Sequence, residues 1–138
     1  MNAEHVDVAT PHDYVTATER FLALVPRVEP MHPTSVADVE RMMGRAGSLG
    51  VLVMASLDQG PIISLLGPPR RLAIYLVGSP FIGAKIFAER PDAGLYAPAH
   101  VTIYEHADGK AHIAYDRVLP EFDEVLSAIS QALSSQCS

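Results

Sequence analysis

The sequence predicts an α+β fold, in which helices and strands build one domain, on three observations. Two strongly apolar runs, residues 49–57 and 71–77, have the length of buried strands. Residues 78–80, Gly-Ser-Pro, have the composition of a helix start, because serine is a good N-cap and proline suits the first turn. The pair Asp108-Gly109 is favoured in tight β-hairpins, so it predicts two antiparallel strands around it.

Length and composition are those of a single domain with an apolar surplus. A chain of 138 residues buries roughly 70% of its unfolded surface, which is enough for a core without metals or disulfides. Apolar residues make up 49% of the chain and charged residues only 19%. This balance leaves apolar surface for a partner, and we expect a homodimer.

The same counts disfavour several partners and locations. The single cysteine, Cys137, can close no disulfide within the chain, which favours a reducing compartment. The first residues lack the basic region and apolar core of a secretory signal, and no apolar run approaches the ~20 residues of a membrane helix. A net charge of -6 argues against nucleic acid, whose phosphates attract clustered lysine and arginine. We therefore expect a cytoplasmic protein that binds neither membrane nor nucleic acid.

The N-terminal segment, residues 1–34, is predicted to be a helical extension. Thr10 has the properties of an N-cap, and Pro11 would then be the first helical residue. Tyr14 and Phe21 recur at helical spacing and indicate one buried stripe, and three later prolines end the helix.

The rest of the chain, residues 35–138, is predicted to form the main α+β part of the same globular domain. Its elements follow from apolar periodicity, caps and breakers. The expected elements are a helix over 35–46, a strand over 49–57, a short helix over 58–66, a strand over 71–77, a helix over 80–89, strands over 100–105 and 111–116, and a helix over 120–133.

The hairpin turn also predicts a register. A two-residue loop at Asp108-Gly109 sets Glu105 opposite His112, and side chains then alternate between two faces. One face is expected to carry His100, Thr102, Tyr104, Ile113 and Tyr115, and the other Val101, Ile103, Glu105, His112, Ala114 and Asp116. The first face is semi-polar and aromatic, which is typical of a ligand pocket or a wet dimer interface. Because Asp116 is expected to face away from His100, a His/Asp pair within the hairpin is disfavoured.

The semi-polar face supplies most of the candidate site residues. His100 is the candidate general acid or base, because an imidazole titrates near neutral pH, and Tyr115 is the candidate catalytic hydrogen-bond donor. Thr102 and Tyr104 are candidate ligand-binding residues. Ser79 is a third, because the free amides at a helix N-terminus suit an anion. The alternative is structural: the aromatic rings pack in an interface and Ser79 only caps its helix.

The histidines do not predict a metal site. His100, His106 and His112 recur at equal intervals, yet His106 would lie about 20 Å from His100 along the strand, and His112 is expected to face the other way. No metal is therefore expected. Haem stays an open alternative, since one axial ligand suffices and His32 beside Met31, or His100, would supply it. No other cofactor is indicated.

Residues 78–115 also carry a recognisable order of motifs. Gly-x-Pro opens the stretch and Pro91 follows, then x-Pro-x-x-Val-x-Ile-Tyr-Glu over 97–105 and Ala-Asp-Gly-Lys over 107–110. In this combination the chain resembles the family called domain of unknown function 302 (DUF302), over residues 35–118. The resemblance implies a two-layer α+β sandwich, with helices packed on one side of a mostly antiparallel sheet and an extra N-terminal helix here, and commonly a dimer.

The resemblance names a fold and no reaction, so the expected function rests on the hairpin. We expect a homodimer that binds a small organic molecule in a cleft over residues 100–116. One alternative is a cofactor-independent acid–base enzyme of the isomerase, cyclase or lyase type, which would use His100 and a tyrosine donor. Another alternative is a dimer module that binds no ligand.

Overall fold

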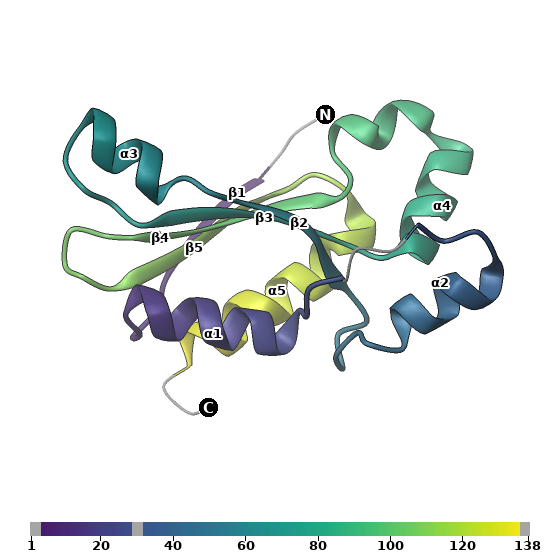
Figure 1. The fold of residues 1–138 in the computed structure, drawn as a ribbon, viewed down its shortest axis with the longest axis horizontal. Helices are drawn as coiled ribbons and strands as arrows, with labels where there is room; N and C mark the ends of the chain where they lie inside the picture. Colours follow the sequence, from purple (N-terminus) through teal and green to yellow (C-terminus); the bar gives the residue numbers. More distant parts are fainter. Residues whose placement is uncertain (1–3, 29–31, 136–138) are drawn as a thin grey trace.

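The computed structural model describes residues 4–28 and 32–135; Met31 and Cys137, on which two of the expectations above rest, lie outside these ranges. Figure 1 shows the arrangement of the helices and strands. In chain order the elements are β1 (Glu4–Ala9), α1 (Tyr14–Leu24), α2 (Val36–Met43), β2 (Leu52–Asp58), α3 (Gly60–Leu66), β3 (Leu72–Gly78), α4 (Pro80–Glu89), the 3-10 helix η1 (Pro91–Leu95), β4 (Ala99–Glu105), β5 (Ala111–Arg117) and α5 (Pro120–Ser134).

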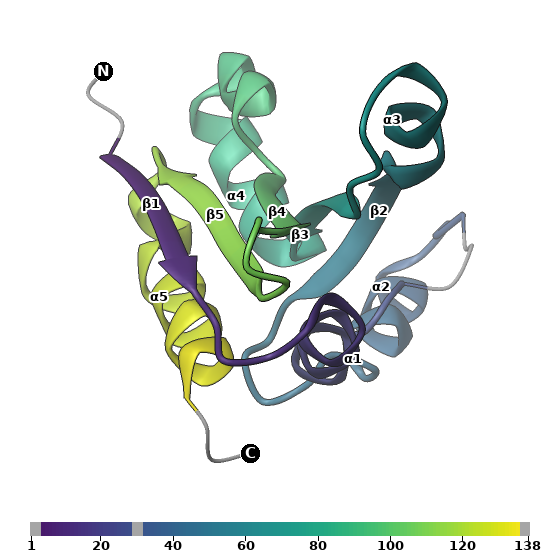
Figure 2. The ribbon, with the colours of Figure 1, turned by 90° about the vertical axis from the view of Figure 1, so that its left-hand side faces the viewer.

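The five strands form one antiparallel sheet in the order β1-β5-β4-β3-β2. Helices α1 and α5 lie together under one face of this sheet, whereas α3 and α4 extend from its opposite ends (Figures 1 and 2). The predicted α+β class and the two-layer arrangement are confirmed. The opposite face of the sheet is covered by neither α1 nor α5 (Figure 2).

The main core lies between the sheet and the helices α1 and α5. Its largest side chains are fully buried and come from both layers: Phe21, Ile103, Ile113, Phe122, Ile129 and Leu133. The ring of Phe21 on α1 packs 4.7 Å from that of Tyr75 on β3, measured between centroids. Burial of such side chains stabilises a fold by about 1.5–3 kcal/mol each, so α1 is held by the same core as the sheet.

The N-terminal segment contains a strand that the sequence analysis did not predict. In β1 only Val6 and Val8 are partly buried against the core, while His5 and Asp7 point to the other side. Two apolar residues in alternation give a weak strand signal, and β1 forms because it completes the sheet by pairing with β5. The expected purely helical extension is therefore wrong in this respect.

The predicted start of α1 is also wrong. Asp13, not Thr10, is the N-cap, and its carboxylate accepts a hydrogen bond of 2.8 Å from the amide of Thr16. Thr10 is buried and donates its hydroxyl to the carbonyl oxygen of Ala111, 2.8 Å away. Because this contact joins the end of β1 to the start of β5, Thr10 is used by the sheet and the helix begins later.

The hairpin between β4 and β5 differs from the predicted one by a single residue. The amide of His106 donates to the carbonyl of Lys110 at 2.8 Å, which leaves a three-residue loop that ends at Gly109 with φ +83°. The carboxylate of Asp108 accepts the Lys110 amide at 2.8 Å and so supports this longer turn. The positive φ at the last loop residue is typical of three-residue hairpin loops.

This difference exchanges the faces of β5. Tyr104 pairs with His112 rather than with Ile113, and Val101 pairs with Tyr115. Ile113 and Tyr115 therefore face the core, where both are buried. The opposite face of the sheet, which α1 and α5 do not cover, is called the open face below. It carries His112, Ala114 and Asp116 together with His100, Thr102 and Tyr104. The predicted faces of β5 are corrected, and so is the predicted Glu105–His112 pair, since Glu105 lies opposite Ala111. Burial of an isoleucine and a tyrosine outweighs the small preference for a two-residue loop.

None of the helices in the described ranges has both the length and the apolar composition needed to cross a lipid bilayer.

Candidate functional site

A cavity lies where strands β4 and β5 separate. Their ladder ends at the pair Val101 and Tyr115, although β5 continues to Arg117. Next to this end lies an open pocket of about 310 Å³, with the largely exposed side chains of His5 and Asp116 at its rim. Four polar side chains line one part of it, namely His5, His100, Thr102 and Asp116, and three buried apolar side chains line another, namely Leu119, Phe122 and Leu126. The cavity thus lies between side chains of the open face of the sheet and side chains of the apolar core.

Three of the predicted site residues meet at this cavity. His100 and Thr102 line it from β4, and Tyr115 lines it from β5. The hydroxyl of Tyr115 is already engaged, because it lies 3.2 Å from the hydroxyl of Ser130, which itself donates to the carbonyl of Ser127. Tyr115 is therefore a wall of the cavity, and its hydroxyl donates to Ser130 on α5.

The structure adds a His–Asp pair that the sequence analysis missed. Nδ1 of His5 on β1 lies 2.8 Å from a carboxylate oxygen of Asp116 on β5, and both side chains line the cavity. The pair could not be foreseen because β1 was not predicted and Asp116 was placed on the wrong face. The alternation of Val6 and Val8 with polar neighbours was the only signal in the sequence for a strand at this position.

Several polar atoms in the cavity have no partner within residues 4–28 and 32–135. In these ranges no hydrogen bond reaches the ring of His100, the hydroxyl of Thr102 or Nε2 of His5. Both ring nitrogens of a histidine and a threonine hydroxyl can donate or accept, depending on tautomer and rotamer. These groups are therefore available to a bound molecule.

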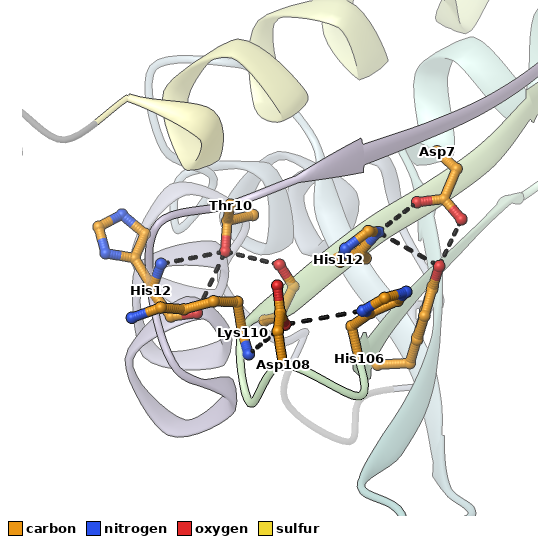
Figure 3. Close-up of polar contacts among 9 residues, drawn as sticks. Asp7, Thr10, His12, His106, Asp108, Lys110 and His112 are labelled. Carbon is orange, nitrogen blue, oxygen red and sulfur yellow. Dashed lines mark hydrogen bonds and ion pairs between the residues drawn. The ribbon is translucent and has the colours of Figure 1, made fainter.

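Tyr104 belongs to a different cluster, on the same face of the sheet. Its hydroxyl donates to one carboxylate oxygen of Asp7. Nδ1 of His112 lies 2.8 Å from the other oxygen, and Figure 3 marks this contact between Asp7 and His112 with a dashed line. The rings of His106 and His112 stack with their centroids 4.5 Å apart. Tyr104 does not line the cavity, and its predicted place beside His100 in one site is not what the structure shows.

Burial, hydrogen bonds and charges in this cluster shift two pKa values. Burial, and then the hydrogen bond to Asp7 and its negative charge, raise the pKa of Tyr104 to about 12. Partial burial raises the pKa of Asp7, but hydrogen bonds from Tyr104 and His112 and the charge of His112 outweigh it, so this pKa is lowered. Tyr104 therefore stays a donor and Asp7 an acceptor near neutral pH.

Ser79 lies at a second cavity, apart from the first. Its hydroxyl accepts the amide of Ile82 at 3.5 Å and caps α4, and it lies 3.8 Å from the sulfur of Met43. This cavity, of about 300 Å³, is lined mainly by apolar side chains such as Met54 and Phe87. The structure shows Ser79 in its capping role and does not bring it to His100.

Within the described ranges, no group of three or more histidine, cysteine, aspartate or glutamate side chains is arranged to hold a metal ion. Of the two histidines considered for haem, His100 lines the first cavity, and His32 lies exposed ahead of α2.

Comparison with known proteins defines the family to which this chain belongs. The sequence model of the family described as "Domain of unknown function DUF302" matches residues 31–135, and the chain belongs to this family. The match extends the resemblance seen in the motifs to the end of α5. A structure titled "Crystal structure of uncharacterized conserved protein DUF302 from Bacillus stearothermophilus" is similar over 94% of this chain and 86% of that chain, with a TM-score of 0.59 and 12% sequence identity. At this identity the likeness shows the fold alone. No curated protein sequence matched the chain.

Proposed function

We propose that this protein binds a small, partly apolar molecule in the cavity between β4 and β5. The observation that supports the proposal is a set of polar groups without a partner among the described residues, His100, Thr102 and Nε2 of His5, beside an apolar wall. Small-molecule sites are mostly apolar concavities with a few polar groups that fix the orientation of the ligand.

The size of the cavity limits the ligand. Pockets for small molecules commonly enclose about 300–1,000 Å³. The cavity, at about 310 Å³, is at the lower end of that range. Its apolar wall is formed by Leu119, Phe122 and Leu126, which are nearly fully buried. The ligand is therefore a compact molecule with an apolar body and one hydrogen-bonding end.

A thermal-shift screen with a metabolite library tests this proposal, using the wild type, His100→Ala and His32→Ala. His32 is an exposed histidine away from the cavity and provides the matched control. We expect at least one ligand that stabilises the wild type and the His32 variant equally. Its affinity for the His100 variant should fall at least tenfold, which is a free-energy change of about 1.4 kcal/mol.

Other results of the screen would count against the proposal. A wild type that no library member stabilises would favour the dimer module without a ligand. A His100 variant that melts lower but binds as well as the wild type would make His100 a structural residue.

One observation favours a second function, cofactor-independent acid–base chemistry of the isomerase, cyclase or lyase type. It is the 2.8 Å contact between His5 and Asp116, a histidine–carboxylate pair beside a cavity. The tyrosine donor expected beside His100 is weakened as a candidate, because the hydroxyl of Tyr115 donates to Ser130 and that of Tyr104 donates to Asp7.

We also propose that the protein is a homodimer in the cytoplasm. Support for a dimer comes from α3, where Leu65 and Leu66 have 84% and 85% of their surface exposed. Exposed neighbouring leucines are more typical of an interface than of free surface. Support for the cytoplasm comes from the single cysteine of the sequence, which can close no disulfide within the chain.

A further inference from the structure

We propose that the imidazole of His5 is a general base in this cavity, oriented by Asp116, and that the ligand is a small weak acid whose proton it takes. The inference rests on the proposed binding function and adds to it the chemical class of the ligand. It also assigns a role to β1, which lies ahead of residues 31–135 that match the family.

The contact with Asp116 determines which ring nitrogen acts. A carboxylate can only accept a hydrogen bond, so the nitrogen 2.8 Å away, Nδ1, carries the proton of the neutral ring. Nε2 then bears the lone pair, and within residues 4–28 and 32–135 no hydrogen bond engages it. A carboxylate in this position both orients the ring and stabilises the imidazolium that forms when Nε2 takes a proton.

The register of the sheet holds the pair in place. His5 on β1 lies directly opposite Asp116 on β5, so both side chains leave the sheet on the same face. Other titratable groups facing His5 are Asp7, two residues further along β1, and His100 from β4, which lines the same cavity. His100 has no carboxylate partner in the described ranges, which makes His5 the better oriented of the two bases.

The proton transfer needs no further reactant. The O–H bond of the acid breaks, an N–H bond forms at Nε2, and the products are an anion and an imidazolium ion whose charge is balanced by Asp116. The apolar wall of Leu119, Phe122 and Leu126 takes up the body of the molecule. A compact aromatic or alkyl compound with one acidic hydroxyl group fits both the polar and the apolar part of the cavity.

The experiment uses 4-nitrophenol as the probe, because its ionised form absorbs at a longer wavelength than the neutral form. Binding is measured by calorimetry, and the ionised fraction of the bound probe is measured by absorbance as the pH is varied. The proteins compared are the full-length wild type, His5→Gln, Asp116→Asn and the control His32→Gln, each checked for folding by its melting temperature. Nitrogen-15 spectra of the histidine rings report the tautomer of His5 independently.

In the wild type we expect the bound probe to ionise at a pH at least one unit lower than in His5→Gln, which is a tenfold change in the ionisation equilibrium. Asp116→Asn should lose part of this difference and mix the two tautomers of His5, and His32→Gln should behave as the wild type. A bound probe that ionises at the same pH in the wild type and in His5→Gln would overturn the inference. A wild type that does not bind 4-nitrophenol would also overturn it, because the weak-acid class would be wrong. The proposed binding function is decided separately, by the library screen.

Discussion

The hydroxyl of Tyr104 on β4 donates to the carboxylate of Asp7 on β1, and it reaches that carboxylate across the intervening strand β5. His112 of β5 donates to the other oxygen of the same carboxylate at 2.8 Å. One carboxylate thus connects three neighbouring strands on the open face of the sheet. Because β1 is an edge strand, this contact fastens the N-terminal segment to the rest of the fold.

Removing the tyrosine hydroxyl should weaken this attachment. We expect Tyr104→Phe to lower the free energy of unfolding by about 1.5 kcal/mol, the lower end of the range for a hydrogen bond to a charged group, since the site is partly exposed. Urea denaturation measures the change. Tyr96→Phe, which alters an exposed tyrosine on the cavity rim, is the control and should leave stability unchanged. Equal losses in both variants would mean that the hydroxyl of Tyr104 contributes nothing specific.

The lowered pKa of Asp7 predicts a dependence of stability on pH. Because this pKa is lower in the folded state, the stabilisation by Asp7 is present above the unfolded pKa of about 4 and is lost as the pH falls through the folded value. We expect Asp7→Asn to melt lower than the wild type at pH 7 and to lose less stability between pH 5 and pH 2. Melting curves across this range test it, with Asp92→Asn, an exposed carboxylate of η1, as the control. If the stability of Asp7→Asn fell as steeply as that of the wild type between pH 5 and pH 2, the prediction would be contradicted.

The buried stripe of α1 should be essential to stability. Phe21 is fully buried and packs against Tyr75, so Phe21→Ala should cost about 3 kcal/mol, the amount typical of a large-to-small change in a core. Val15 lies on the same helix with 47% of its surface exposed, and Val15→Ala should change stability little. The comparison of the two melting temperatures tests whether the N-terminal segment is part of the core. An unchanged melting temperature for Phe21→Ala would show that α1 is loosely attached.

The proposed dimer makes a prediction about mass. Light scattering at micromolar concentration should give twice the chain mass of 14.9 kDa. The double substitution Leu65→Glu and Leu66→Glu on α3 should reduce the particle to a single chain, because two charges would be buried in the interface. A wild type that scatters as a single chain would refute the dimer, and a variant that stays dimeric would place the interface elsewhere.

Most of the helices and strands after residue 35 were predictable, because their signals are local. The N-cap at Ser79 and the proline after it start α4 where expected, and α5 runs over Pro120–Ser134 against a predicted 120–133. Caps, breakers and apolar runs act over a few residues, and a single sequence displays them directly.

The arrangement of the site was less predictable, because it depends on contacts between distant residues. A loop longer by one residue moved Tyr115 into the core and Asp116 onto the face of His100. His5 and Asp116 are 111 residues apart in the chain, and no local pattern connects them. His100 and Thr102 lie on the predicted face of the sheet, because β4 precedes the turn whose length differs from the predicted one. Side chains after a turn change face when its length changes by one, so residues on β5 could not be placed without the fold.

The pairing of β1 with β5 affects how the chain folds during synthesis. The ribosome synthesises β1 early and β5 late, since the paired residues Glu4 and Arg117 are 113 positions apart. A growing chain that has not reached β5 has no partner for β1, and the apolar residues Val6 and Val8 stay exposed to water until then. Contacts over such long separations slow folding, because a large loop must close before they form. During synthesis β1 therefore cannot join the sheet before β5 has left the ribosome.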